Sequence, residues 1–257
     1  MRQDARGKGP LCKSEYIYGL HSVREHLRAR PQDLRCVFCR PGPRTAAVER
    51  LARDAGVPVR HEEGRVLDRL VGGARHQDVV ASVGPFRYVA FAELAASGAE
   101  LLLLLDGVVD PRNLGALLRT AEAAGVGGVI LPRDRSAEIT PVVTRTSAGA
   151  TAYLRIAQVS NVARCLDELR ALGYWIVGLW PQARESLYAL RLPDRVTLVV
   201  GGEGKGIRPL VLRHCDFLAA IPMYGRVESL NASVAGGIAL FELVRRRLGS
   251  PPGREPP

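Results

Sequence analysis

The polar residues of this chain that could do chemistry are concentrated in three segments, each of which joins an apolar run to a turn. The segments are DPRNLGALLRTAEAAG (110–125), VVGGEGKGI (199–207) and IPMYGRVESLNASVAGGIALFE (221–242). Each one places Asn, Ser, Arg or Glu at the end of a predicted strand or the start of a predicted helix, where α/β proteins bind ligands. We therefore expect the three segments to fold together into one polar pocket.

The glycine-rich segment has the form of a ligand-binding loop but matches neither of the common nucleotide motifs. A P-loop would need Gly in place of Val199 and Ser or Thr in place of Gly206. A dinucleotide fingerprint would need Gly three residues after Gly204, where this chain has Ile207. The glycines still let the backbone approach a ligand closely, and Glu203 is the acid of the loop. The alternative is a tight turn with a solvated Glu203.

The third segment is the most unusual, because Ser229, Asn231 and Ser233 stand two residues apart just before a predicted helix. Each of them could cap that helix by accepting a hydrogen bond from a backbone N–H, but one cap needs only one such residue. The helix is rich in Gly and Ala, and its glycines cost helix propensity. We therefore expect a partner helix or a ligand to approach its backbone closely.

In the first segment, Asn113 and Arg119 are the polar residues of interest. We expect Asn113 to be the N-cap of a helix over residues 114–124. Arg119 lies off the apolar stripe of that helix. It is either available to a ligand or paired on the surface with Glu122, one turn further along.

The second part of the chain must position these segments, and its pattern alternates apolar strands with amphipathic helices. We expect strands at 101–106, 128–131, 175–179, 196–200 and 217–221, and helices at 114–124, 162–172, 210–214 and 234–248. This alternation is typical of an α/β fold with a mostly parallel sheet covered by helices on both faces. We assign residues 100–248 to this domain.

The first part of the chain indicates a smaller α/β domain over residues 15–83. Its expected elements are helices at 21–29, 46–55 and 66–70 and strands at 35–39, 57–60 and 79–83. Residues 84–99 form the predicted linker, with one short helix. We expect both ends, residues 1–14 and 249–257, to be disordered because they are rich in Gly, Pro and charge.

The charge of the chain favours a nucleic-acid partner without proving one. The formal net charge is +10 and the sequence pI is about 9.9, with an equal surplus of basic residues before and after residue 101. A coding bias toward Arg and Ala would give the same balance. Apolar runs such as Leu101–Leu105 are far shorter than the ~18 residues of a membrane span.

The cysteines add little. Cys36 and Cys39 form a CxxC pair, but no second pair stands at a spacing typical of zinc ligands, so we expect a structural role and no metal. The N-terminus has no apolar core of a secretory signal, and five cysteines in a chain without such a signal suit a reducing compartment. We expect a cytoplasmic protein.

The three segments together resemble the signature motifs of the SpoU/TrmH family of RNA ribose 2′-O-methyltransferases, in the SPOUT superfamily. The motifs NLGALLRTAEAAG, GGEGKG and IPMYGRVESLNASVA occur in the family's order over about residues 100–248. The front part, YIYGLHSVREHLRA and ARHQDVVASV, is similar to the ribosomal-protein-like RNA-binding domain of the bacterial branch that methylates a guanosine of 23S rRNA. That branch has HQG where this chain has His76, Gln77 and Asp78.

The resemblance implies a deep trefoil knot that holds S-adenosylmethionine, a homodimer, and RNA rather than DNA or a membrane as partner. It implies that the active site is lined by Asn113, Arg119, Glu203, Ser229 and Asn231, with Ser233 as a weaker candidate. It implies that the cofactor is bound by Gly201, Gly202, Ile221, Met223 and Leu230. The small-residue face of the last helix would suit the dimer interface.

The implied reaction transfers the methyl group of the cofactor's sulfonium to a ribose 2′-hydroxyl. We expect Arg119, which stays protonated, to act as a charged clamp on the target nucleotide. Glu203 would orient Arg119 or the nucleotide, and Ser229 and Asn231 would hold the substrate and cofactor loops. A tRNA methyltransferase of the same family, a non-catalytic RNA-binding relative and a generic nucleotide-dependent enzyme are the alternatives.

Overall fold

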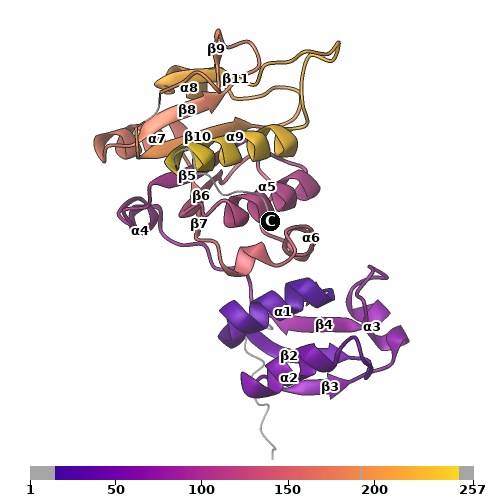
Figure 1. Ribbon diagram of the computed structural model, residues 1–257. Coiled ribbons are helices and arrows are strands. Elements are labelled where there is room, and N and C mark those ends of the chain that lie inside the picture. Colours follow the sequence, from indigo (N-terminus) through magenta and orange to yellow (C-terminus); the bar gives the residue numbers. More distant parts are fainter. Residues whose placement is uncertain (1–14, 192, 249–257) are drawn as a thin grey trace, which may run out of the picture. The chain divides into compact units, whose positions relative to one another are not determined.

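The chain divides after Phe86 into two compact units, each of which is described by itself (Figure 1). The computed structural model describes residues 15–191 and 193–248. The two ends for which the sequence predicts disorder, residues 1–14 and 249–257, lie outside the described residues.

The first unit is a four-stranded mixed sheet with the strand order β1-β4-β2-β3, in which only β2 and β3 run parallel. Residues from α1 and α2 pack on one face of the sheet, and Leu67 of α3 packs on the other with Tyr18 and Val80. The elements are β1 Glu15–Tyr18, α1 Leu20–Ala29, η1 Pro31–Asp33, β2 Leu34–Cys39, α2 Ala46–Asp54, β3 Val59–His61, α3 Gly64–Leu70 and β4 Val79–Val83.

Strand β1 is absent from the sequence prediction. The side chains of β1 alternate between the two faces of the sheet, as they do in any strand. Ile17 packs in the core cluster on one face and Tyr18 in the cluster on the other. Four residues give too short a pattern to separate a strand from the start of the helix that follows. The sequence therefore predicts three of the four strands of this unit.

The second unit is a seven-stranded parallel sheet with the order β7-β6-β5-β10-β8-β11-β9. Its strands are β5 Leu101–Asp106, β6 Gly128–Pro132, β7 Ile156–Val159, β8 Trp175–Leu179, β9 Glu185–Ser186, β10 Val196–Gly201 and β11 Phe217–Ala220. Its helices are α4 Phe91–Ala95, α5 Pro111–Ala123, α6 Pro141–Thr146, η2 Ala150–Ala152, α7 Val162–Ala171, α8 Pro209–Arg213 and α9 Ala232–Arg247.

Helices cover both faces of this sheet, which is why its central strands are apolar throughout. Val199 of β10 belongs to the cluster that includes residues of α4, α7 and α8. The next residue, Val200, lies against Gly236 of α9 on the opposite face. Successive side chains of a strand point to opposite faces, so both must be apolar when both faces are buried.

The sequence prediction missed β7, β9 and α6. Strand β7 carries the half-exposed Gln158 and β9 has two residues, so neither gives the long apolar run by which buried strands are found. Helix α6 has six residues, and its N-cap is Thr140. Elements this short depend on tertiary contacts more than on their own pattern.

The N-cap of α5 is Asp110, and the prediction that Asn113 caps this helix was wrong. The carboxylate of Asp110 accepts a hydrogen bond of 2.8 Å from the backbone N–H of Arg112. Pro111 follows at the first helical position, where its fixed φ favours the helix and its missing N–H costs nothing. Asn113 therefore lies inside the first turn, and its side chain is left for other partners.

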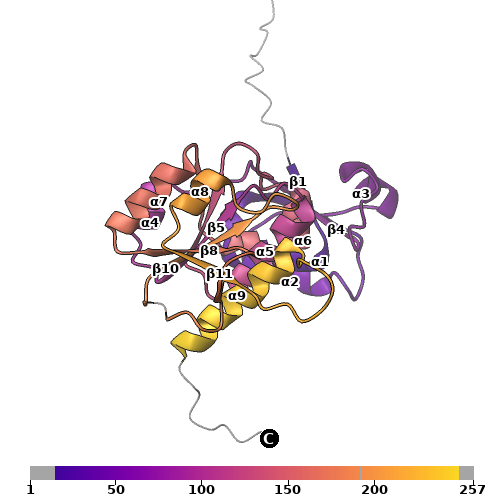
Figure 2. The same ribbon diagram turned by 90° about the horizontal axis from the view of Figure 1, so that it is seen from above.

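The small residues of α9 are explained by α5 of the same chain. A Cβ on Gly236 would lie 2.5 Å from Cδ2 of Leu117, and one on Gly237 would lie 3.5 Å from Cγ2 of Thr120. Figures 1 and 2 both show the two helices side by side. The partner that the sequence predicts for this helix is therefore α5, and the small-residue face is already in use within one chain.

The last turns of α9 contain a buried carboxylate. The side chain of Glu242 is 7% exposed and accepts hydrogen bonds of 2.7 Å from Nε of both Arg245 and Arg246. Arg246 also donates to the backbone carbonyls of Leu187 and Leu190. The hydrogen bond from Arg245, aided by Arg246, lowers the pKa of Glu242 from 4.5 to about 2 although burial opposes this shift. Glu242 thus connects α9 to the segment after β9.

We expect Glu242→Gln to lower the free energy of unfolding by roughly 2 kcal/mol near neutral pH, since hydrogen bonds to charged groups contribute about 1.5–3 kcal/mol. Because folding lowers this pKa, the contribution is fully present above the unfolded value of 4.5 and is lost as the pH falls toward about 2.

Urea unfolding of both proteins from about pH 7 to about pH 3 measures this difference. It should be constant above about pH 5.5 and then shrink. The matched control is Glu168→Gln, since Glu168 is 46% exposed and its ion pair among the described residues is with the exposed Arg164. A difference that does not change with pH would contradict the role given to the carboxylate.

Within the described part of the chain, no helix combines the length and the apolarity that a bilayer crossing requires.

Candidate functional site

A pocket of about 530 Å³ lies beyond the carboxyl ends of β8, β10 and β11. It is formed by the residues that follow these strands and by the start of α9. This is the edge at which ligands bind in parallel α/β sheets, and the volume is within the usual range of about 300–1,000 Å³. The lining residues are Leu179–Gln182, Val200–Gly206, Ile221, Met223, Glu228–Ala232 and Ala235.

Two glycines at the end of β10 allow the close backbone contacts that shape this pocket. A Cβ on Gly202 would lie 1.9 Å from the carbonyl oxygen of Gly107, in the turn that follows β5. A Cβ on Gly201 would lie 2.1 Å from the carbonyl carbon of Gly206. Real Cβ atoms do not come this close to backbone, so only glycine fits either position.

An ion pair between the buried Asp106 and the partly exposed Arg208 fixes the other side of the same loop. Asp106, the last residue of β5, is fully buried, and its carboxylate accepts hydrogen bonds from Nε of Arg208 at 2.8 Å and from the backbone N–H of Arg208 at 2.9 Å. The backbone N–H of Gly202 donates to the carbonyl of Asp106 at 3.0 Å. The ends of β5 and β10 and the residues before α8 are thereby held together.

The polar residues of the three segments form one chain of hydrogen bonds at the rim of the pocket. Nδ2 of Asn113 donates to Oε1 of Glu203, and Nδ2 of Asn231 donates to Oδ1 of Asn113 at 3.1 Å. Oδ1 of Asn231 accepts from the hydroxyl of Ser233 at 2.5 Å and from its backbone N–H at 2.9 Å. In this series each residue donates to the next, from Ser233 through Asn231 and Asn113 to the carboxylate of Glu203.

Asn231 therefore has two roles. It is the N-cap of α9, accepting hydrogen bonds from the backbone N–H groups of Ser233 and Val234, and its amide nitrogen extends the network to Asn113. The start of the last helix and the polar rim of the pocket share one side chain.

The structure brings together most of the residues that the sequence predicts for the site. Eight of the ten line the pocket, and they are Gly201, Gly202, Glu203, Ile221, Met223, Ser229, Leu230 and Asn231. Asn113 is joined to two of them by hydrogen bonds. Their roles in binding and catalysis remain predictions.

Arg119 stands apart from this group. Its side chain is exposed on α5 and makes no hydrogen bond or ion pair with the described residues, Glu122 included. It lies six residues beyond Asn113, about 9 Å along the helix axis. Glu203 is held by Asn113, so within one chain it does not orient Arg119.

Sequence reasoning missed the contribution of the segment after β8. Trp180 and Gln182 line the pocket, and the ring of Trp180 lies 2.8 Å from where a Cβ on Gly206 would be. Gly206 has a φ of +62°, a conformation that glycine adopts freely. The other segments were selected because they follow predicted strands. Residues 180–182 also follow a predicted strand, which ends at residue 179, so the same criterion would have identified them.

The pocket suits a ligand with a flat apolar part and a polar part, as S-adenosylmethionine has. Trp180, Ile221, Met223 and Leu230 provide apolar surface, and the glycine-rich loop leaves backbone N–H and C=O groups accessible.

Two family models match the chain. Residues 100–241 match the model of the SpoU rRNA Methylase family, and residues 16–89 match the model described as RNA 2′-O ribose methyltransferase substrate binding. The chain belongs to the SpoU rRNA methylase family.

Members of the family resemble the chain over nearly all its length. A Xanthomonas campestris protein named 23S rRNA (guanosine-2′-O-)-methyltransferase RlmB is 44% identical over 93% of this chain and 99% of the relative. The structure of the AdoMet-bound rRNA methyltransferase of Sinorhizobium meliloti is similar, with a TM-score of 0.77 and 28% identity. The match covers 93% of this chain and 89% of that protein. The A. aeolicus TrmH/SpoU tRNA modifying enzyme, at 30% identity and a TM-score of 0.53, covers only 61% of this chain and 80% of its own.

We expect Gly202→Ala to weaken S-adenosylmethionine binding more than about tenfold and to lower the stability by roughly 1–3 kcal/mol, because the added methyl group must push the Gly107 turn away. Calorimetric titration and thermal unfolding measure the two effects.

The matched control is Gly225→Ala, in the loop before α9, where a Cβ meets nothing within 4 Å. This variant should bind the cofactor as the parent protein does. Equal behaviour of the two variants would show that the backbone contact at Gly202 does not shape the pocket.

Proposed function

We propose that this protein uses S-adenosylmethionine to methylate a ribose 2′-hydroxyl in RNA, at a guanosine of 23S rRNA. The observation that carries the proposal is the hydrogen-bonded chain of Glu203, Asn113 and Asn231 at the rim of a glycine-lined pocket. Relatives that match both units are named for this reaction. A solved structure named as a tRNA enzyme covers 61% of the chain, which favours ribosomal RNA over the tRNA alternative.

In this proposal the pocket residues Gly201, Gly202, Ile221, Met223 and Leu230 hold the cofactor, which supplies a methyl group on a positively charged sulfur when bound. The glycines allow the backbone to reach polar atoms of the ligand, and the three apolar side chains cover its carbon skeleton. These residues exclude water from the methyl group and fix its direction.

The polar rim would position the ribose. A 2′-hydroxyl is a poor nucleophile while it is protonated, so the site must orient it and direct its proton away. The amides of Asn113 and Asn231 are fixed by each other and by Glu203, so little reorganisation is needed when the ribose arrives. Ser229, exposed in the pocket wall, adds a hydroxyl that can hold the nucleotide.

Arg119 would act as a charged clamp. Its guanidinium has no partner among the described residues and stays protonated, so it can bind the phosphate beside the target ribose and lower the proton affinity of the hydroxyl. The proton then leaves to phosphate or water.

Three further features belong to the proposal. Residues 15–83 would bind the RNA, residues 84–99 would be the linker and residues 100–248 would be the catalytic domain, in a cytoplasmic protein. A trefoil knot would form at the pocket, and the close backbone contact of Gly202 with Gly107, in the turn after β5, supports it. A homodimer would form through the outer face of α9, where Val234 and Phe241 are each 50% exposed.

A transfer assay tests the activity. With labelled S-adenosylmethionine, the protein should methylate a 23S rRNA transcript in preference to tRNA, and a 2′-deoxy substitution at the mapped nucleotide should abolish incorporation. Label in tRNA alone, or label that survives the 2′-deoxy substitution, would contradict the proposal.

We expect Arg119→Ala to lower the rate of methyl transfer by at least about 100-fold while RNA binding remains measurable, since loss of an electrostatic contact in the transition state costs about 10²–10³ in kcat. Arg164→Ala is the control, because Arg164 is equally exposed but pairs within α7. Equal loss of binding and turnover in Arg119→Ala would count against the clamp.

We expect Phe241→Glu to convert a dimer into monomers at micromolar concentration, because it places a charge in the centre of an apolar interface. Sedimentation equilibrium measures the change. Leu172→Glu is the control, at an equally exposed apolar residue that follows α7. A parent protein that sediments as a monomer would refute the dimer.

A further inference from the structure

Three side chains that can bind a metal meet at one end of the sheet in the first unit, outside the proposed active site. Cys39 and His61 are the last residues of β2 and β3, and they are register partners in this parallel pair. Glu49 reaches the same point from α2. Each side chain offers one ligand atom, and the three atoms lie within 4.8 Å of one another.

The spacing of these atoms matches the requirements of zinc. Sγ of Cys39 lies 3.5 Å from Oε1 of Glu49, and Nε2 of His61 lies 3.3 Å from Oε2 of Glu49. A tetrahedral Zn²⁺ with Zn–S of about 2.3 Å and Zn–N and Zn–O of about 2.0–2.1 Å has edges of about 3.5 Å between S and O and about 3.3 Å between N and O. Each of these two contacts has the length of an edge of a zinc site, and the two contacts end on different oxygens of the same carboxylate.

The charge at this point also favours a cation. The side chain of Glu49 is 11% exposed, yet its permanently charged partner is Arg53, which is 72% exposed and lies 3.8 Å away. Its other neighbours are the thiol of Cys39, the hydroxyl of Thr45 and the imidazole of His61. Burying a charged carboxylate costs free energy unless an opposite charge or hydrogen-bond donors compensate it. A divalent cation bound to Glu49 would supply that opposite charge.

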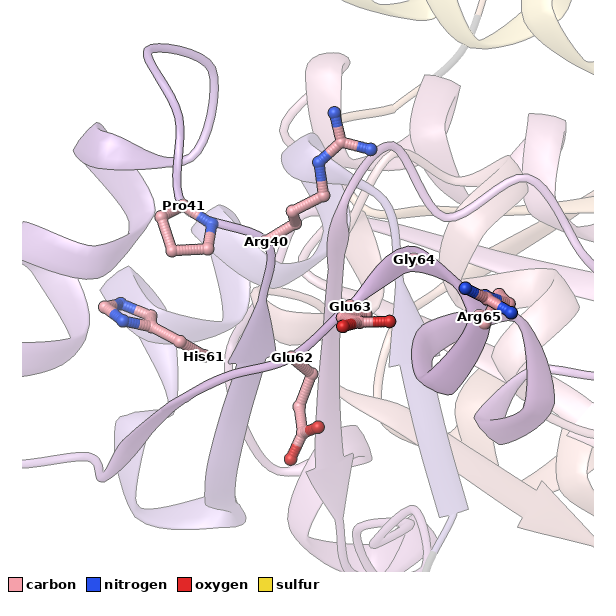
Figure 3. A pocket seen from close by; sticks show the side chains of 7 residues that line it. All are labelled: Arg40, Pro41, His61, Glu62, Glu63, Gly64 and Arg65. Atoms are coloured by element: carbon pink, nitrogen blue, oxygen red, sulfur yellow. The ribbon is translucent and has the colours of Figure 1, made fainter.

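A metal ion can reach the three ligands from solvent. The side chain of His61 is 56% exposed and lines two surface hollows, one with Glu49, Arg53 and Pro58, the other with Arg40 and Glu62. In Figure 3, Glu62 points away from the imidazole. Glu49 and His61 thus face one hollow that is open to solvent, and Cys39 is buried behind them.

The CxxC pair does not form this site as a pair. Cys36 and Cys39 are three residues apart on a strand, so their side chains point to opposite faces of the sheet. Only Cys39 meets His61 and Glu49, and these residues follow it by 22 and 10 positions. The spacing rules for zinc motifs do not cover this arrangement, which explains why the sequence indicates no metal.

We propose that Cys39, Glu49 and His61 bind one Zn²⁺ ion, with water as the fourth ligand. The set combines sulfur, nitrogen and oxygen, which suits a borderline-soft ion and not Mg²⁺ or Ca²⁺. On binding, the thiol proton passes to solvent and the thiolate bonds the metal. The ion joins α2 to the ends of β2 and β3 and so stiffens the first unit. It has no part in methyl transfer.

The test uses the full chain, stripped with a chelator and titrated with Zn²⁺ in competition with a chromophoric chelator. We expect one equivalent to bind, and a higher midpoint of thermal unfolding that falls again when a chelator is added. Co²⁺ in place of Zn²⁺ should give the absorption of a tetrahedral thiolate complex. Absence of Zn²⁺ binding at micromolar concentration would overturn the proposal.

Paired variants locate the site. His61→Ala, at an exposed side chain, and Cys39→Ser should weaken Zn²⁺ binding by more than about tenfold, since loss of a residue that merely orients a ligand already costs about 10–100-fold. His21→Ala and Cys36→Ser, at the other exposed histidine and the other cysteine of the pair, should bind as the parent does. Unchanged binding in His61→Ala, or equal loss in Cys36→Ser, would overturn the proposal.

Discussion

The second unit depends on backbone-to-backbone contact at the end of β10. Gly201 and Gly202 lie against the turns at Gly206 and Gly107 with no room for a side chain. The contact at Gly202 brings the segment after β5 to the end of β10, and Gly206 of the same loop lies against Trp180 in the segment after β8. The pocket exists because three pieces of chain can approach more closely than side chains would allow, and Asp106 with Arg208 holds them there. The hydrogen bonds between Glu203, Asn113 and Asn231 require this proximity.

The sequence predicted the long buried strands and the amphipathic helices well, because in these elements the pattern of apolar residues matches the side chains that are buried. Two of the three predicted segments line one pocket and the first is joined to them through Asn113, since strand ends in a parallel sheet share one edge. The prediction failed where an element is too short to have a period, as in β1, β7 and β9. It also failed at Asn113, because Asp110, followed by Pro111 at the first helical position, starts the helix three residues earlier.

Other parts of the two sites could not be predicted, because they depend on contacts between distant residues. The pairing of Asn113 with Glu203 joins positions 90 residues apart. The approach of His61 to Glu49 and Cys39 depends on the parallel register of β2 and β3. The family resemblance supplied expected roles for the site residues but not their geometry, in which Glu203 is bound to Asn113 and Arg119 has no partner among the described residues.

The position of Asn231 has a consequence for how the protein is made. Its amide completes the rim with Asn113, which precedes it by 118 residues, and it also begins α9. A nascent chain that has not yet released α9 from the ribosome has all the strands of the sheet but neither the closing amide nor the helix that covers β10. The rim of the pocket is thus completed only when the final helix has been synthesised.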